Sequence, residues 1–86
     1  MRYMLTFTWK QPPGEEVMKL MPAEHARGQE LGEQGIAEPP ELAADQSTIW
    51  GVWNRESLDE VQETLKTLPL YEYFNVDVSP LAPKEQ

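Results

Sequence analysis

The chain has 86 residues and a formal net charge of −8, and it contains no cysteine and one histidine. Its length suits one domain, which at this size is only marginally stable alone and gains stability by oligomerising. The acidic balance argues against nucleic acid and anionic membrane surfaces as partners, because both bind basic patches. The composition also excludes disulfides, thiolate chemistry and a multi-histidine metal site, and no apolar run approaches the roughly 20 residues of a membrane-spanning helix.

The first third of the chain predicts a strand followed by a helix. Residues 2–10 alternate between the two faces of a strand rather than running solidly apolar, so we expect a strand and not a signal peptide, in a cytoplasmic protein. The sequence QPPG at 11–14 turns the chain. Residues 15–34 carry an apolar stripe at helical spacing and predict a helix that ends near Gly35. Pro22 predicts that this helix either begins afresh or kinks there.

The remainder of the chain predicts three strands and one helix. A Pro-Pro pair interrupts residues 36–45, where we therefore expect an irregular or edge strand. Residues 47–54 predict a regular strand. The Ser-x-x-Glu pattern at 57–60 predicts the start of a helix that ends at Pro69, and residues 71–78 alternate as a last strand.

This order, βαββαβ, is that of the ferredoxin-like α+β fold, with both helices on one face of a four-stranded antiparallel sheet. We expect one domain over residues 1–80 and an extended tail over residues 81–86. Bulky side chains fall on both faces of the strands, since Ile49 and Trp53 lie opposite Trp50 in the alternation. We therefore expect the second sheet face to be buried against another subunit.

Three blocks of the sequence are similar to those of one known family. The block TLKTLPLYEYFNVDVSPLAP at 64–83 contains a Leu-Pro-Leu-aromatic turn, a last strand and a Pro-Leu tail. The opening strand MRYMLTFTWKQPP and the helix AEHARGQELGEQG at 23–35 are similar as well. Together they resemble the muconolactone isomerase family over nearly the whole chain. The resemblance implies a protomer that pairs sheet to sheet into a dimeric α+β barrel, with decamers in the isomerases. It also implies lactone isomerisation in aromatic catabolism, by proton transfer without a metal or an organic cofactor.

One functional residue of the family has a counterpart in this sequence, and two others do not. Glu24 falls on the first-helix glutamate of the family, its proposed proton-transfer base. Met21 stands where the family has a lysine, and residues 36–45 contain no counterpart of the family's substrate-binding arginine. We therefore expect the scaffold and the base of the family, with a substrate different from muconolactone.

Glu24 also stands out from the residues alone, because it interrupts an apolar helical stripe. A carboxylate that faces the sheet is desolvated, which raises its pKa and suits acid/base catalysis. Alternatively, Pro22 shifts the stripe and Glu24 is a first-turn glutamate favoured by the helix dipole. We expect Glu24 as the catalytic residue and a substrate-binding set beside it. That set comprises His25, Trp50, Tyr73 and Met21.

Three members of this substrate-binding set also have a structural interpretation. His25 points about 100° away from Glu24 around the helix, so it lies at the pocket rim or is solvated or at a subunit contact. Trp50 also suits a core or an interface, and the Tyr73 hydroxyl also suits a structural hydrogen bond.

Three functions remain open from the sequence. The first is a cofactor-free isomerase, or a related proton-shift or elimination catalyst, that acts on a small lactone or ring compound. The second is a non-catalytic ligand-binding or assembly protein on the same fold. The third is a cofactor-independent oxygenase of the same architecture. In each case we expect a homo-oligomer, a dimer at least and a decamer in the isomerase case, with no metal or organic cofactor.

Overall fold

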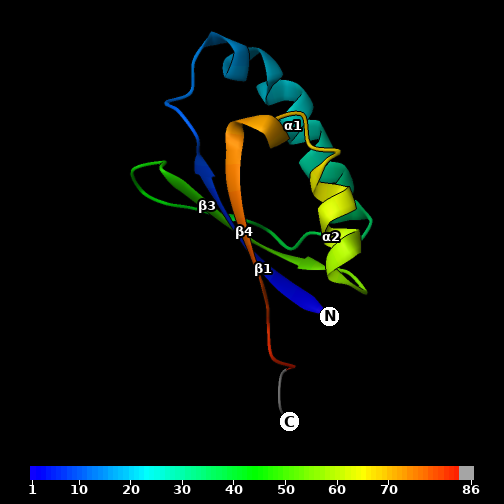
Figure 1. Ribbon diagram of the computed structural model, residues 1–86. Coiled ribbons are helices and arrows are strands. Elements are labelled where there is room, and N and C mark those ends of the chain that lie inside the picture. The colour runs from blue at the N-terminus through cyan, green and yellow to red at the C-terminus, as the bar shows by residue number, and fades with distance from the viewer. Residues whose placement is uncertain (84–86) are drawn as a thin grey trace.

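Four antiparallel strands form one sheet in the order β2-β3-β1-β4, and two helices lie against one of its faces (Figure 1). The computed structural model describes residues 1–83. Its elements, in chain order, are β1 (Arg2–Trp9), α1 (Glu15–Glu33), β2 (Glu41–Leu42), β3 (Thr48–Asn54), α2 (Leu58–Leu65), the 3₁₀ helix η1 (Tyr71–Tyr73) and β4 (Phe74–Pro80). The predicted α+β, ferredoxin-like fold is confirmed.

The strand register assigns each side chain of the sheet to one of two faces. Leu5 pairs with Gly51 of β3 on the face that the helices cover. Thr6 pairs with Trp50 of β3 and Asp77 of β4 on the opposite face. We call this opposite face, which no element within residues 1–83 covers, the open face.

The hydrophobic core lies between the covered face and the two helices. It comprises Tyr3, Leu5, Phe7, Val17, Leu31, Trp53, Val61, Leu65, Leu68, Leu70 and Phe74. Burying each of these side chains contributes roughly 1.5–3 kcal/mol, so the core holds both helices against the sheet.

Helix α1 runs without interruption from Glu15 to Glu33, with Pro22 in its interior. Of the two alternatives predicted at Pro22, a helix that begins afresh there is therefore wrong, and a kink stays a prediction. Proline has no N–H, so the carbonyl of Met18 lacks its usual partner four residues on. Met18 itself is 66% exposed, so this interruption of the hydrogen-bond ladder lies on the solvent side of the helix.

Gly35 ends α1 as the sequence predicts. Its φ of 79° lies in the left-handed region, which glycine adopts without a steric penalty. The N–H of Gly35 donates to the Gly32 carbonyl at 3.1 Å, and the N–H of Ile36 donates to the Leu31 carbonyl at 2.9 Å. This pair of bonds is a Schellman cap, which satisfies the last carbonyls of the helix.

The second half of the chain departs from the prediction at two element ends. β2 is a two-residue strand at the sheet edge, as expected for residues 36–45. Helix α2 ends at Leu65, before Pro69, because the N–H groups of Thr67 and Leu68 bond three residues back. β4 begins at Phe74, so Tyr73 lies in η1 and not in the strand.

The domain boundary at residue 80 stays a prediction. Beyond it, Leu81 still donates its N–H to the Arg2 carbonyl at 2.9 Å, which continues the pairing with β1. Residues 84–86 of the predicted tail lie outside the described residues. No helix within residues 1–83 is long and apolar enough to cross a membrane.

Candidate functional site

Glu24 lies on the side of α1 that faces the rest of the protein, and its side chain is half-buried. Its Oε1 accepts a hydrogen bond from the backbone N–H of Leu70 at 2.9 Å. Leu70 is only 1% exposed and belongs to the connection between α2 and η1, residues 66–70. The bond therefore holds one carboxylate oxygen against the interior and fixes the direction of the side chain.

The surroundings of Glu24 perturb its acidity. Burial disfavours the ionised carboxylate and raises the pKa of Glu24 above its ordinary value. The Leu70 N–H and the charge of His25 act in the opposite direction, but burial has the larger effect. A carboxyl group of this kind accepts and returns protons closer to neutral pH than an exposed glutamate does.

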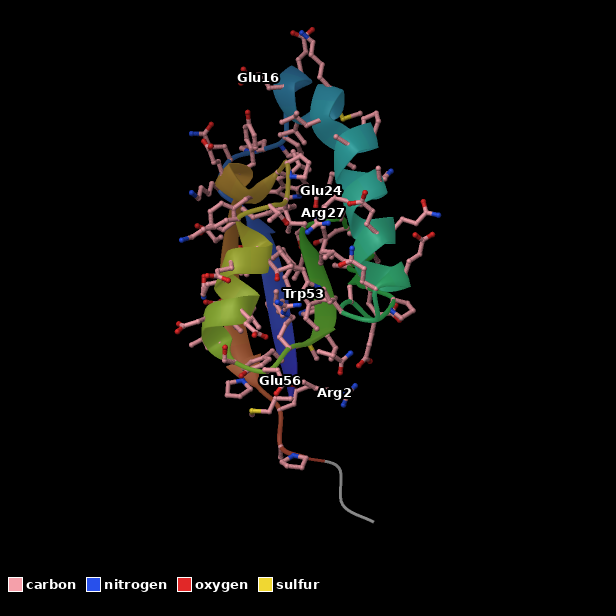
Figure 2. The ribbon with its side chains drawn as sticks, turned by 90° about the vertical axis from the view of Figure 1, so that its right-hand side faces the viewer. Arg2, Glu16, Glu24, Arg27, Trp53 and Glu56 are labelled. Atoms are coloured by element: carbon pink, nitrogen blue, oxygen red, sulfur yellow. The ribbon has the colours of Figure 1, made fainter. Side chains whose placement is uncertain are left out.

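Arg27 lies one helical turn after Glu24 and also extends toward the α2–η1 connection (Figure 2). Its Nε donates to Oγ1 of Thr67 at 3.0 Å, and its Nη1 donates to Oε1 of Glu30 at 3.0 Å. The sequence reasoning did not select Arg27. The three-residue spacing from Glu24 was the available signal, because residues three apart share a helix face.

The other two arginines of the chain are paired elsewhere. Arg2 makes a bidentate contact with Glu38, at 2.9 and 3.0 Å. Arg55 lies 3.6 Å from the carboxylate of Glu60 at the start of α2. Arg27 is therefore the arginine that shares the α2–η1 connection with Glu24.

The predicted substrate-binding residues are not brought together as one cluster. Met21 shares the face of Glu24 on α1 and packs against the core, whereas His25 is exposed. Trp50 is 40% exposed on the open face, so the sheet separates it from Glu24 within one protomer. Tyr73 lines a surface depression of about 420 Å³ that also includes Lys10.

Two depressions lie on the surface of the described residues, and Glu24 lines neither of them. The depression beside Tyr73 lies at the turn before α1, and a second, of about 190 Å³, lies between α2 and β4. Trp53 lies on the covered face, the side of the sheet on which α1 and Glu24 lie, and it is 5% exposed (Figure 2). Trp9 also packs against the core on this face. Across the described part of the chain, no group of three or more acidic, histidine or cysteine side chains is placed to hold a metal ion.

Comparison with known proteins identifies the family of the whole chain. The family model described as muconolactone delta-isomerase matches residues 1–86. No curated protein matches at a significant level. A crystal structure of muconolactone isomerase is similar over 98% of this chain and 91% of its own, with 23% identity and a TM-score of 0.83.

A second solved structure is also similar. It is 5-chloro-2-hydroxyhydroquinone dehydrochlorinase from Burkholderia phenoliruptrix AC1100, in complex with 2,5-dihydroxybenzoquinone. The likeness covers 93% of each chain, with 20% identity and a TM-score of 0.68. At these identities the two structures show the shared fold, whereas the family model spans the full sequence. The chain therefore belongs to the muconolactone delta-isomerase family.

Proposed function

We propose that the protein catalyses a cofactor-free proton shift on a small lactone or related ring compound, with Glu24 as the acid/base group. The observation that carries this proposal is the half-buried carboxylate of Glu24, which is oriented by the Leu70 N–H at 2.9 Å. That bond uses Oε1, and Oε2 remains the oxygen for proton transfer.

The proposed reaction needs only Glu24 as proton acceptor and donor. The Glu24 carboxylate removes a proton from a saturated ring carbon that adjoins the carbonyl or its conjugated double bond, and the electron pair is delocalised onto the carbonyl oxygen. The protonated Glu24 then returns the proton to another carbon of the conjugated system, which moves the double bond. The raised pKa of Glu24 supports both steps, because a stronger base abstracts the proton more readily and returns it near neutral pH.

A purely structural role for Glu24 is the competing interpretation, because its carboxylate also caps a buried N–H. Glu24→Gln separates the two, since the amide oxygen still accepts from Leu70 but cannot act as a base at neutral pH. We expect wild-type protein to convert members of a panel of unsaturated lactones, muconolactone included, and Glu24→Gln to remain folded without turnover. Retained turnover by Glu24→Gln would show that Glu24 is structural.

Elimination is a second candidate reaction, favoured by the likeness to a dehydrochlorinase. In that reaction the ring first takes up a proton at the chlorinated carbon to form its keto tautomer. A carboxylate then removes a hydroxyl proton, and the electron pair moves through the ring and expels chloride, so that HCl is lost and a quinone forms. Chloride release from a chlorinated hydroxyhydroquinone would identify this activity. Oxygen consumption with polyphenols would instead indicate the oxygenase, and binding without turnover would indicate a ligand-binding protein.

We further propose that two protomers associate through the open face, as a dimeric α+β barrel requires. Trp50 supports this assembly, because its large apolar side chain is 40% exposed beside the half-buried Met4 and Val52. Exposed tryptophan on a sheet face is typical of an interface. Assembly into a decamer, a cytoplasmic location and a role in aromatic catabolism are further parts of this proposal.

A further inference from the structure

Glu24 and Arg27 reach from neighbouring turns of α1 to one short connection. Glu24 accepts from the Leu70 N–H at 2.9 Å, and Arg27 donates to the Thr67 hydroxyl at 3.0 Å. Glu24 and Arg27 are three positions apart on α1, and their partners are three positions apart in the connection. The two bonds therefore join the same two segments. The Glu24 carboxylate and the permanent cation of Arg27 therefore both contact one connection, from neighbouring turns of α1.

The guanidinium of Arg27 has capacity for a ligand. Its side chain is 26% exposed, so a molecule from solvent can reach it. Nε and Nη1 are used by Thr67 and Glu30, and neither of these bonds involves Nη2. The Glu30 side chain is 59% exposed, and an ion pair this exposed contributes little stability. An incoming anion can therefore displace the Glu30 carboxylate at small cost.

We propose that Arg27 binds the negatively charged ring oxygen of the substrate beside Glu24. The inference rests on the proposed function and names its substrate class, namely cyclic carbon acids whose conjugate base carries its charge on a ring-attached oxygen. When Glu24 removes a proton, charge develops on that oxygen, and a guanidinium is a strong partner for such an anion. A local cation favours the binding of an anion here, because the chain as a whole carries a net charge of −8 and repels anions.

Tetronic acid is a suitable probe, because it is a small lactone whose enol is ionised at neutral pH and therefore resembles the deprotonated substrate. Its methyl ether has the same ring without the charge and serves as the neutral control. Titration calorimetry at pH 7 should show that wild-type protein binds tetronate more tightly than the ether. Arg27→Gln should weaken tetronate binding about tenfold or more, as expected for loss of a charged hydrogen bond, and leave the ether unaffected.

Two further variants separate charge from packing. Thr67→Val removes the same contact with Arg27 but keeps the cation, and it should bind tetronate like the wild type. Glu30→Gln removes the competing carboxylate and should bind tetronate more tightly than the wild type.

Three results would overturn the inference: no tetronate binding by wild-type protein, wild-type affinity in Arg27→Gln, or equal losses for tetronate and its ether. The proposed function is tested separately, by the turnover of Glu24→Gln. Loss of turnover there, together with unchanged tetronate binding in Arg27→Gln, would overturn the role of Arg27 alone.

Discussion

Replacement of Glu24 by alanine tests whether its carboxylate is held as the structure shows. The change leaves the N–H of Leu70, a residue that is 1% exposed, without its acceptor. A buried donor that loses its partner costs about 1–3 kcal/mol in the free energy of unfolding. Alanine also removes a half-buried charge, and relief of its desolvation offsets part of that cost. We therefore expect a net loss at the lower end, about 1 kcal/mol, which for a chain of this size lowers Tm by roughly 4–8 °C.

The assay is thermal unfolding followed by circular dichroism at pH 7, at one fixed protein concentration because association also shifts Tm. Glu24→Gln is the matched variant, since its amide oxygen keeps an acceptor for the Leu70 N–H. It should unfold at or above the wild-type temperature. The reasoning is refuted if Glu24→Ala unfolds like the wild type, or if Glu24→Gln loses as much stability as Glu24→Ala.

Four other predictions address the same structure. The raised pKa of Glu24 means that the folded state holds its proton more tightly than the unfolded state does. The free energy of unfolding of the wild type, relative to that of Glu24→Gln, should therefore fall as the pH rises from the ordinary glutamate pKa through the raised one. Urea-unfolding stabilities of the two proteins that stay parallel across pH would contradict this. Trp50→Glu should reduce the assembly to the 9.9 kDa protomer in light scattering, whereas Met18→Glu, on the exposed side of α1, should keep at least the dimer. Leu65→Ala, at a side chain that is 1% exposed, should cost about 2–5 kcal/mol in urea unfolding, and a loss below about 1 kcal/mol would contradict its place in the core. Gly35→Ala forces a side chain into a φ of 79° and should cost about 1 kcal/mol in the same assay, where unchanged stability would argue against the left-handed cap.

The fold could be predicted from the sequence because its signals are local. Alternation in residues 2–10, the Ser57 cap and Gly35 each act over a few neighbouring residues, and the structure contains the corresponding strand, capping bond and helix end. The misplaced boundary at Pro69 has a local cause that the periodicity did not reveal. Leu68 continues the apolar stripe of α2, but its N–H bonds to the Leu65 carbonyl in a tighter turn.

The candidate site depends on contacts that no local pattern encodes. The stripe on α1 indicated that Glu24 faces inward, but its partner Leu70 is 46 positions away in the sequence. Arg27 contacts Thr67 only because α1 packs beside the α2–η1 connection. The strand pattern correctly predicted that Trp50 and Trp53 lie on opposite faces of the sheet. Only the placement of α1 over the covered face shows that Trp53 is the one on the side of Glu24.

The central claim is that Glu24 exchanges protons with a carbon of a bound ring compound. Proton NMR in D₂O tests it directly, through the loss of ring C–H signals from unsaturated lactones incubated with the protein. We predict that wild-type protein replaces a ring hydrogen beside the carbonyl with deuterium and that Glu24→Gln, folded and at the same concentration, leaves the signal at its uncatalysed rate. Equal exchange rates for the two proteins, or no exchange by the wild type with any lactone of the panel, would contradict the account.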